Sequence, residues 1–265
     1  IYFSAEVNMD KRNLKAKLNY EGKLFKSNTC GDVIVLKYES SKNVLVRFVE
    51  TGYTTTVSAG NLVSGGVKDP FYPTVCGVGF LGGKFTKQNF KETSYVCWSS
   101  MLYRVFHTRT KENRPTYQDC SVSDRFKCFA DFKFWCVGQV GYDSYDDKGK
   151  PFALDKDILV KGNKIYSADT CCFVPREINS LFNTHGNASG DCSLGVCKKG
   201  SKFQSSISKC GERVFLGSFL TEQEAFQAYK TSKERYIKDV ANKWKDQIDI
   251  RVYEALMNWE VGVDD

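Results

Sequence analysis

Residues 23–73 alternate between apolar and polar positions, as half-buried β-strands do. Apolar runs cover 32–38, 44–49 and 54–57, and turn-forming residues separate them. Three or four short strands in this segment predict a small β-barrel. The segment holds no clustered acids, bases or metal ligands, so we interpret it as a scaffold or as a docking module for a protein partner.

Helical spacing follows the proline-punctuated segment 68–73. Apolar residues three and four positions apart predict helices over 94–103 and 125–137. We expect their aromatic side chains to be core residues, namely Trp98, Phe126, Phe129, Phe132, Phe134 and Trp135. Residues 1–22 are polar and lysine-rich and are interpreted as an N-terminal arm.

The segment 152–182 predicts two strands followed by a helix. The first strand is expected over 154–160, and Gly162-Asn163 supplies turn chemistry. The second strand leads to Pro175, which favours the start of a helix. The pattern is that of a compact ββα unit.

Two carboxylates and an amide are expected to meet in this unit. On a strand, Asp155 and Asp157 share one face while Lys156 points to the other. The helix brings Asn179 back across the strands, so Asp155 and Asn179 would ligate one Mg²⁺ or Mn²⁺ ion, with Asp157 as a secondary ligand. Such an ion suits phosphodiester cleavage, although the same spacing also fits polar residues that are merely exposed to solvent.

The stretch that begins at Trp98 and includes LDKDILVKGNKIYSADTCCFVPREIN resembles the HNH endonucleases of phages, many of which are homing enzymes. In that phage homing branch, an Asp-His pair on the first strand and an Asn on the helix form a ββα-metal site. The resemblance implies that Asp155 is the metal-binding aspartate and that Asn179 is the helix asparagine. The family's loop asparagine, which orients the histidine base, has no clear counterpart here, and Tyr166 lies nearest to its place.

Lys156 stands where the family has its catalytic histidine. A lysine acts as a base only if burial or a neighbouring cation lowers its pKa, whereas the flanking Asp155 and Asp157 favour the protonated form. We therefore expect Lys156 to contact the scissile phosphate rather than to accept a proton. Catalytic decay of the site is the alternative interpretation.

Eleven cysteines occur at irregular spacing, and we interpret them as buried, reduced thiols. Zinc is not expected, because the adjacent Cys171 and Cys172 would face opposite sides of a strand.

Three further strands are predicted over 194–199, 202–208 and 213–219. Thr221, with Glu224 three residues later, predicts the capping box of a following helix. A break at Asp246–Asp249 divides the last helical stretch.

The three strands and the capped helix resemble the AP2 DNA-binding domain, which occurs in plant transcription factors and is fused to phage HNH enzymes. The matching residues are Gly195-Val196, Lys202-Phe203, Ile207, Leu216-Gly217-Ser218-Phe219, Thr221–Ala225 and Ala228-Tyr229. In that family the sheet lies in the major groove of double-stranded DNA. The resemblance, with the alternation along the strands, implies DNA contacts from Lys198, Lys199, Lys202, Gln204, Ser206, Ser208, Arg213 and Phe215. Arg213 is the best candidate for reading guanine, and the lysines are expected on phosphates.

Charge is distributed unevenly along the chain. The net charge of +7 is modest. Residues 198–245 hold eleven Lys/Arg against five Asp/Glu, whereas 246–265 hold one Arg against six acids. A basic module followed by an acidic tail supports DNA binding better than the total charge does.

These patterns predict an α+β chain. Its expected parts are an arm (1–22), a small SH3-like barrel (23–73), an HNH-like ββα-metal domain with helices (74–185), a linker (186–192), an AP2-like domain (193–231) and C-terminal helices (232–265). The implied function is sequence-directed DNA cleavage, as nicking with a single ion. The alternatives are a non-catalytic DNA-binding regulator or inhibitor with a decayed HNH fold, and an adaptor whose barrel binds another protein.

No run of about 18 uncharged apolar residues occurs, so no membrane span is expected. Charged residues appear by the tenth position, which argues against a signal peptide. We therefore expect a cytoplasmic protein, and the resemblance to phage HNH enzymes implies a phage-infected bacterial host.

Overall fold

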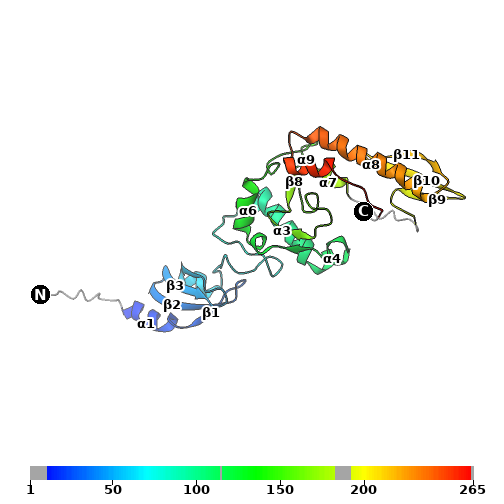
Figure 1. Cartoon of the computed structure of the whole chain (residues 1–265). Coiled ribbons are helices and arrows are strands. Elements are labelled where there is room, and N and C mark those ends of the chain that lie inside the picture. Colours follow the sequence, from blue (N-terminus) through cyan, green and yellow to red (C-terminus); the bar gives the residue numbers. More distant parts are fainter. Residues whose placement is uncertain (1–10, 114, 183–191, 264–265) are drawn as a thin grey trace. The chain divides into compact units, whose positions relative to one another are not determined.

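The computed structural model describes residues 11–113, 115–182 and 192–263 (Figure 1). The fold is mixed α+β, with several separate sheets. It divides into two compact units, of which the first comprises residues 1–118 and 122–134 and the second residues 119–121 and 135–265. The first ten residues of the predicted arm and nearly all of the predicted linker lie outside the described residues.

An antiparallel sheet with the order β1-β2-β3-β4 begins the first unit. Its elements are α1 (Lys11–Tyr20), β1 (Leu24–Lys26), β2 (Asp32–Ser40), β3 (Asn43–Phe48), β4 (Thr54–Val57) and α2 (Ala59–Val63). Alternate residues of β2 and β3, such as Val33, Val44 and Val46, form its core, which confirms the predicted strands. Among the described residues the sheet is open rather than closed into a barrel, because β1 and β4 form its two edges and do not pair with each other.

Helices form the rest of the first unit. They are η1 (Asn89–Lys91), α3 (Thr93–Phe106), α4 (Thr108–Asn113), η2 (Pro115–Tyr117), α5 (Asp124–Lys127) and most of α6 (Phe129–Val137). The single helix predicted over 125–137 is interrupted at Cys128, which is extended and forms a bridge with Phe80. Trp98 is buried and donates its indole N–H to the Phe126 carbonyl at 2.8 Å.

Phe134 was predicted to be a core residue, and this prediction is wrong. Its side chain is 78% exposed, whereas Phe129, Phe132 and Cys136 of the same helix are buried. These three residues follow helical spacing and define the buried stripe of α6, which leaves Phe134 on the opposite face.

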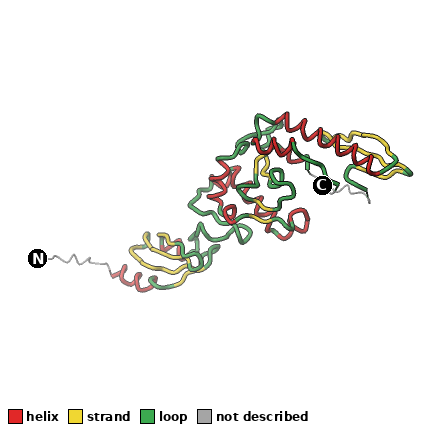
Figure 2. Tube along the Cα trace, in the orientation of Figure 1, coloured by secondary structure: helices red, strands yellow, loops and turns green. Residues whose placement is uncertain are grey.

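Short strands joined by loops begin the second unit (Figure 2). They are β6 (Ala153–Asp155), β7 (Ile165–Tyr166) and β8 (Cys172–Val174), and α7 (Arg176–Ser180) follows them. The short strand β5 (Ser121–Val122) falls on the boundary, with Ser121 in the second unit and Val122 in the first. β6 pairs with β8 in antiparallel register, with Asp155 opposite Cys172. The order of strand, loop, strand and helix agrees with the predicted ββα pattern, but the first strand ends at Asp155 rather than at residue 160.

A second antiparallel sheet, with the order β11-β10-β9, continues this unit. Its strands are β9 (Val196–Lys199), β10 (Lys202–Lys209) and β11 (Glu212–Phe219), followed by α8 (Glu222–Trp244) and α9 (Ile250–Met257). The Thr221 capping box and the break before α9 are both confirmed. α8 continues without interruption past residue 231, where we had placed a domain boundary.

Within the described ranges, every helix is too short or too polar to cross a lipid bilayer.

Candidate active site and nucleic-acid interface

Asp155 stands at the end of β6 and shapes the loop that follows. Its Oδ1 atom accepts hydrogen bonds from the backbone N–H groups of Asp157 at 2.9 Å and Ile158 at 3.0 Å. These two N–H groups are therefore not available to a neighbouring strand, and the strand ends. We had predicted that Asp155 and Asp157 share one face of a strand. This prediction is wrong, because the strand ends at Asp155 and Asp157 lies in the loop that follows.

The Asp155 carboxyl lies in an environment that disfavours its charge. Burial of the carboxyl and then the nearby Asp157 raise its pKa to about 7, against the opposing effect of the two backbone N–H donors. A carboxyl in this state would be stabilised as a carboxylate by an added cation. Carboxylate and amide oxygens are donors that Mg²⁺ accepts, so Asp155, Asp157 and Asn179 fit such an ion by their chemistry.

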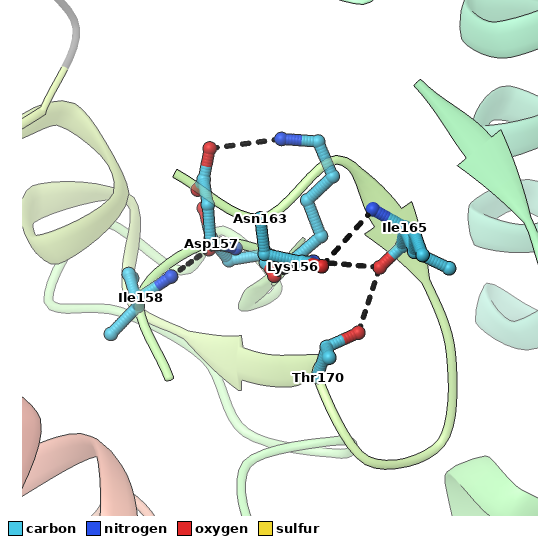
Figure 3. A network of polar contacts seen from close by, with 7 residues as sticks. Lys156, Asp157, Ile158, Asn163, Ile165 and Thr170 are labelled. Carbon is cyan, nitrogen blue, oxygen red and sulfur yellow. Dashed lines mark hydrogen bonds and ion pairs between the residues drawn. The ribbon is translucent and has the colours of Figure 1, made fainter. Parts of the chain in front are cut away.

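Lys156 is buried, with 7% of the residue exposed. Its ammonium group lies 2.9 Å from Asp157 Oδ2 (Figure 3). It also lies 5.8 Å from the centre of the Tyr166 ring. Burial alone would lower the pKa of Lys156, but the hydrogen bond and charge of Asp157 outweigh it and raise the pKa. Lys156 is therefore a protonated side chain at neutral pH and is unsuited to act as a base.

Asn163 is a site residue that sequence reasoning missed. Its Nδ2 group donates to the carbonyls of Lys156 at 2.6 Å and Ile165 at 2.8 Å, and its Oδ1 accepts from the Ile165 N–H at 3.2 Å (Figure 3). Thr170 Oγ1 donates to the same Ile165 carbonyl at 2.7 Å. Asn163 thus closes the loop and holds the backbone of Lys156. The available signal was the Gly162-Asn163 pair, which we had interpreted only as a turn.

Asn179 is half-buried in α7, a helix that packs against β6. Among the described residues, no hydrogen bond joins its side chain to Asp155 or Asp157. No group of three or more His, Cys, Asp or Glu side chains in the described ranges is arranged to hold a metal ion. A site at this place would therefore take most of its ligands from water and substrate, which is usual for Mg²⁺.

The two adjacent cysteines of the ββα unit are both buried. Burial raises the pKa of Cys171 to about 12, and it raises that of Cys172 as well. Both are neutral thiols at physiological pH. The interpretation of the cysteines as buried thiols holds for these two and is wrong for Cys210, which is exposed in the turn between β10 and β11; Cys76, Cys97, Cys192 and Cys197 are only half-buried.

The β9–β11 sheet has one face under α8 and one open face. Ser205 and Ile207 of β10 are buried on the helix side, so their neighbours Gln204, Ser206 and Ser208 point to the open side. Cross-strand pairing places Phe215 beside Ser206 and Arg213 beside Ser208, and Lys199 beside Lys202. We define the open face by seven residues: Lys199, Lys202, Gln204, Ser206, Ser208, Arg213 and Phe215.

Lys198 does not belong to the open face. It pairs with Phe203, which is on the helix side, and its ammonium lies 5.7 Å from the centre of the Phe203 ring. On the open face itself, Arg213 Nε donates to Ser206 Oγ at 2.9 Å, and Phe215 is 62% exposed. Phe215 therefore adds an exposed apolar surface to a face that is otherwise polar and basic.

No protein-family model matches the chain, and neither a curated protein nor a solved structure is significantly similar to it. The resemblances to HNH enzymes and AP2 domains therefore stay predictions that rest on the residues quoted above.

Proposed function

We propose that this protein binds double-stranded DNA through the open face of the β9–β11 sheet and nicks it at the β6–β8–α7 site with one Mg²⁺ ion. One observation carries the proposal: seven of the eight side chains predicted to contact DNA lie on one sheet face, and Phe215 is exposed among them. The major groove of B-DNA admits a two-stranded β-ribbon, so the β10–β11 hairpin, which carries Arg213 and Phe215, can enter it.

The lysine pair at the β9–β10 hairpin supports an anionic ligand. Lys199 and Lys202 lie directly opposite each other on adjacent strands. Like charges in such a pair destabilise a sheet, and a phosphate group between them would remove the repulsion. Arg213 carries five donors in a planar group and suits guanine, whereas Phe215 offers an apolar surface to a base or a sugar.

At the ββα site, Asp155 would hold the ion together with Asp157 and Asn179. When bound, the ion would stabilise the charge of the leaving oxygen and favour deprotonation of water. Asn163 fixes the loop through the Lys156 carbonyl and so positions the backbone beside Asp155. Lys156 supplies a fixed positive charge beside Asp157.

A nicking assay on supercoiled DNA tests the proposal. Wild type is expected to convert the supercoiled form to the open circle with Mg²⁺ or Mn²⁺ and not with EDTA. Asp155→Asn and Asn179→Ala are expected to lower the rate by about 100-fold or more, as substitutions at metal sites do. Asp239→Asn removes an exposed carboxylate of α8 and should leave the rate unchanged. Wild-type preparations that bind DNA but never nick it would contradict the enzymatic part.

One observation favours a second candidate, a non-catalytic DNA-binding regulator. The buried Lys156 ammonium already neutralises Asp157, one of the two carboxylates in the proposed ligand set. For this candidate, binding to a specific DNA sequence persists in Asp155→Asn and Asn179→Ala, and neither metal ion produces a nick in any of the proteins.

A further inference from the structure

Helix α8 contacts the β9–β11 sheet and its β10–β11 turn from the N-terminal part of the helix to Tyr236, just past its middle. Ala225 and Tyr229 are buried on the side that packs against the strands. Further along the helix, the Tyr236 hydroxyl accepts a hydrogen bond at 3.2 Å from the N–H of Cys210, which lies in the turn between β10 and β11. The sheet is therefore supported over several turns of α8, up to Tyr236.

The C-terminal half of α8 holds α7, the short helix that contains Asn179. Lys233 Nζ donates to the Leu181 carbonyl at 2.6 Å. Lys243 Nζ and the Trp244 indole N–H both donate to Glu177 Oε2, at 2.7 Å and 2.8 Å. We call Lys233, Lys243 and Trp244 the α7 clamp.

The same end of α8 also contacts the strand that carries Asp155. The Trp244 ring packs edge-to-face on Phe152, which directly precedes β6, with the ring centres 5.8 Å apart. The loop that follows β6 is also held by the C-terminal segment, because Lys161 Nζ donates to the Glu260 carbonyl at 2.7 Å. The next residue, Val261, donates its N–H to Glu234 of α8 at 3.0 Å.

No unsupported length of α8 separates the two sets of contacts. Lys233 contacts the end of α7, and Tyr236, three residues later, contacts the sheet. The 23 residues of α8 include neither glycine nor proline, the residues at which helices bend most readily. Figure 1 shows α8 as one continuous helix with β9–β11 at one end and α7 and α9 at the other.

We propose that α8 holds the β6–β8–α7 site in a fixed position relative to the open face of the sheet, so that bound DNA is nicked at a constant offset from the recognised sequence. This inference rests on the proposed function. The clamp residues act by positioning α7 and do not touch the substrate.

A first experiment maps the nick to the nucleotide on an end-labelled duplex that carries a bound sequence. The clamp variant is Glu177→Ala with Lys233→Ala, and the matched control is Glu254→Ala with Lys238→Ala, two exposed positions of the second unit. Wild type and control are expected to nick at one phosphate. The clamp variant should bind with affinity within about twofold of wild type, as for substitutions outside the interface, but nick at several neighbouring phosphates. A folded clamp variant that nicks only at the wild-type phosphate overturns the inference.

Trp244→Phe is the milder variant if the double substitution prevents folding. It keeps an aromatic ring on Phe152 and removes the indole N–H that binds Glu177. Like the clamp variant, Trp244→Phe should nick at several neighbouring phosphates. Nicking only at the wild-type phosphate would contradict the role of the α7 clamp.

A second experiment is independent of cleavage. Residual dipolar couplings of backbone amides in the full-length protein should fit one alignment tensor for residues 153–178 and 196–219 in wild type, and two tensors in the clamp variant. Two tensors in wild type would overturn the fixed geometry whatever the nicking assay shows. If wild type fits one tensor but never nicks DNA, the fixed geometry is supported and the proposed cleavage is contradicted. The constant offset of the nick is then contradicted as well.

Discussion

The Asp155 carboxyl group decides both where β6 ends and how the site responds to pH. It accepts two backbone N–H groups of the loop, yet burial and Asp157 raise its pKa to about 7. The same group therefore supports the loop geometry and carries a charge that its surroundings disfavour. A pKa shifted by burial and by a neighbouring charge is common at functional sites.

The raised pKa predicts that Asp155→Asn gains stability relative to wild type as pH rises. In the unfolded chain this carboxyl titrates near 4, so between about pH 4 and 7 the folded state binds its proton more tightly. Wild type therefore loses stability through this window, whereas asparagine cannot ionise. In EDTA, urea unfolding should show the variant gaining on the order of 2 kcal/mol between pH 5 and pH 8.

Asp239→Asn is the control for this comparison, because its carboxylate is exposed on α8. Adding Mg²⁺ at pH 8 should stabilise wild type and not Asp155→Asn, since only an ion bound to the folded state raises stability. A stability difference between wild type and Asp155→Asn that stays the same at pH 5 and pH 8 would show that burial does not disfavour the Asp155 charge.

At the residue scale, the sequence indicated the chemistry of the site better than its geometry. Asp155, Lys156 and Asp157 are together, but an aspartate that caps its own loop cannot be distinguished in sequence from one within a strand. Asn163 escaped notice because its partners are backbone carbonyls, which leave no pattern in the side chains. The sheet face to which the Lys198 side chain points depends on the register of β9 against β10. A shift of one residue in that register moves the side chain to the other face.

At the scale of elements, Gly195 determines how closely β9 approaches α8. Its φ of +74° is disfavoured for other residues, and a Cβ atom there would lie 2.1 Å from the Tyr229 ring. Gly195→Ala should therefore lower the free energy of unfolding by several kcal/mol, from about 1 kcal/mol of backbone strain and a larger cost of overpacking. Thermal and urea unfolding would measure the loss.

Gly200→Ala is the matched control for this change. Gly200 also has a positive φ, at +59°, but nothing lies within 4 Å of a Cβ built there. It should cost only the strain of the left-handed backbone, about 1 kcal/mol. Equal losses in the two variants would show that contact with Tyr229 does not set the distance between β9 and α8.

Elements with strong local signals were predicted well. The strands of both sheets and the Thr221 capping box carry alternation or cap residues that act within a few positions. β6 was predicted too long and α5 and α6 were predicted as one helix, because in each case a distant or side-chain partner replaces regular backbone pairing. Closure of the first sheet into a barrel depends on pairing between its ends, which periodicity does not report.

At the scale of the whole molecule, charge is informative only when it is placed on the structure. The basic stretch 198–245 contributes to both faces of the β9–β11 sheet and to α8, so its total does not say which cations meet DNA. Strand register separates them. Lys199 and Lys202 are on the open face, whereas Lys198 lies against Phe203 on the helix side.

This separation predicts a difference in the salt dependence of DNA binding. Each cation that neutralises a phosphate adds about 0.9 to the slope of log affinity against log salt concentration, because a counterion is released. Replacing both Lys199 and Lys202 by glutamine should therefore lower the slope by about two. Lys198→Gln should leave the slope nearly unchanged, although it removes the same charge from the same hairpin.

Fluorescence anisotropy titrations across a range of salt concentrations would measure the slopes. An equal decrease per lysine at all three positions would mean that the face of the sheet does not determine the contact, and that DNA is bound by the net charge of this stretch rather than by the open face.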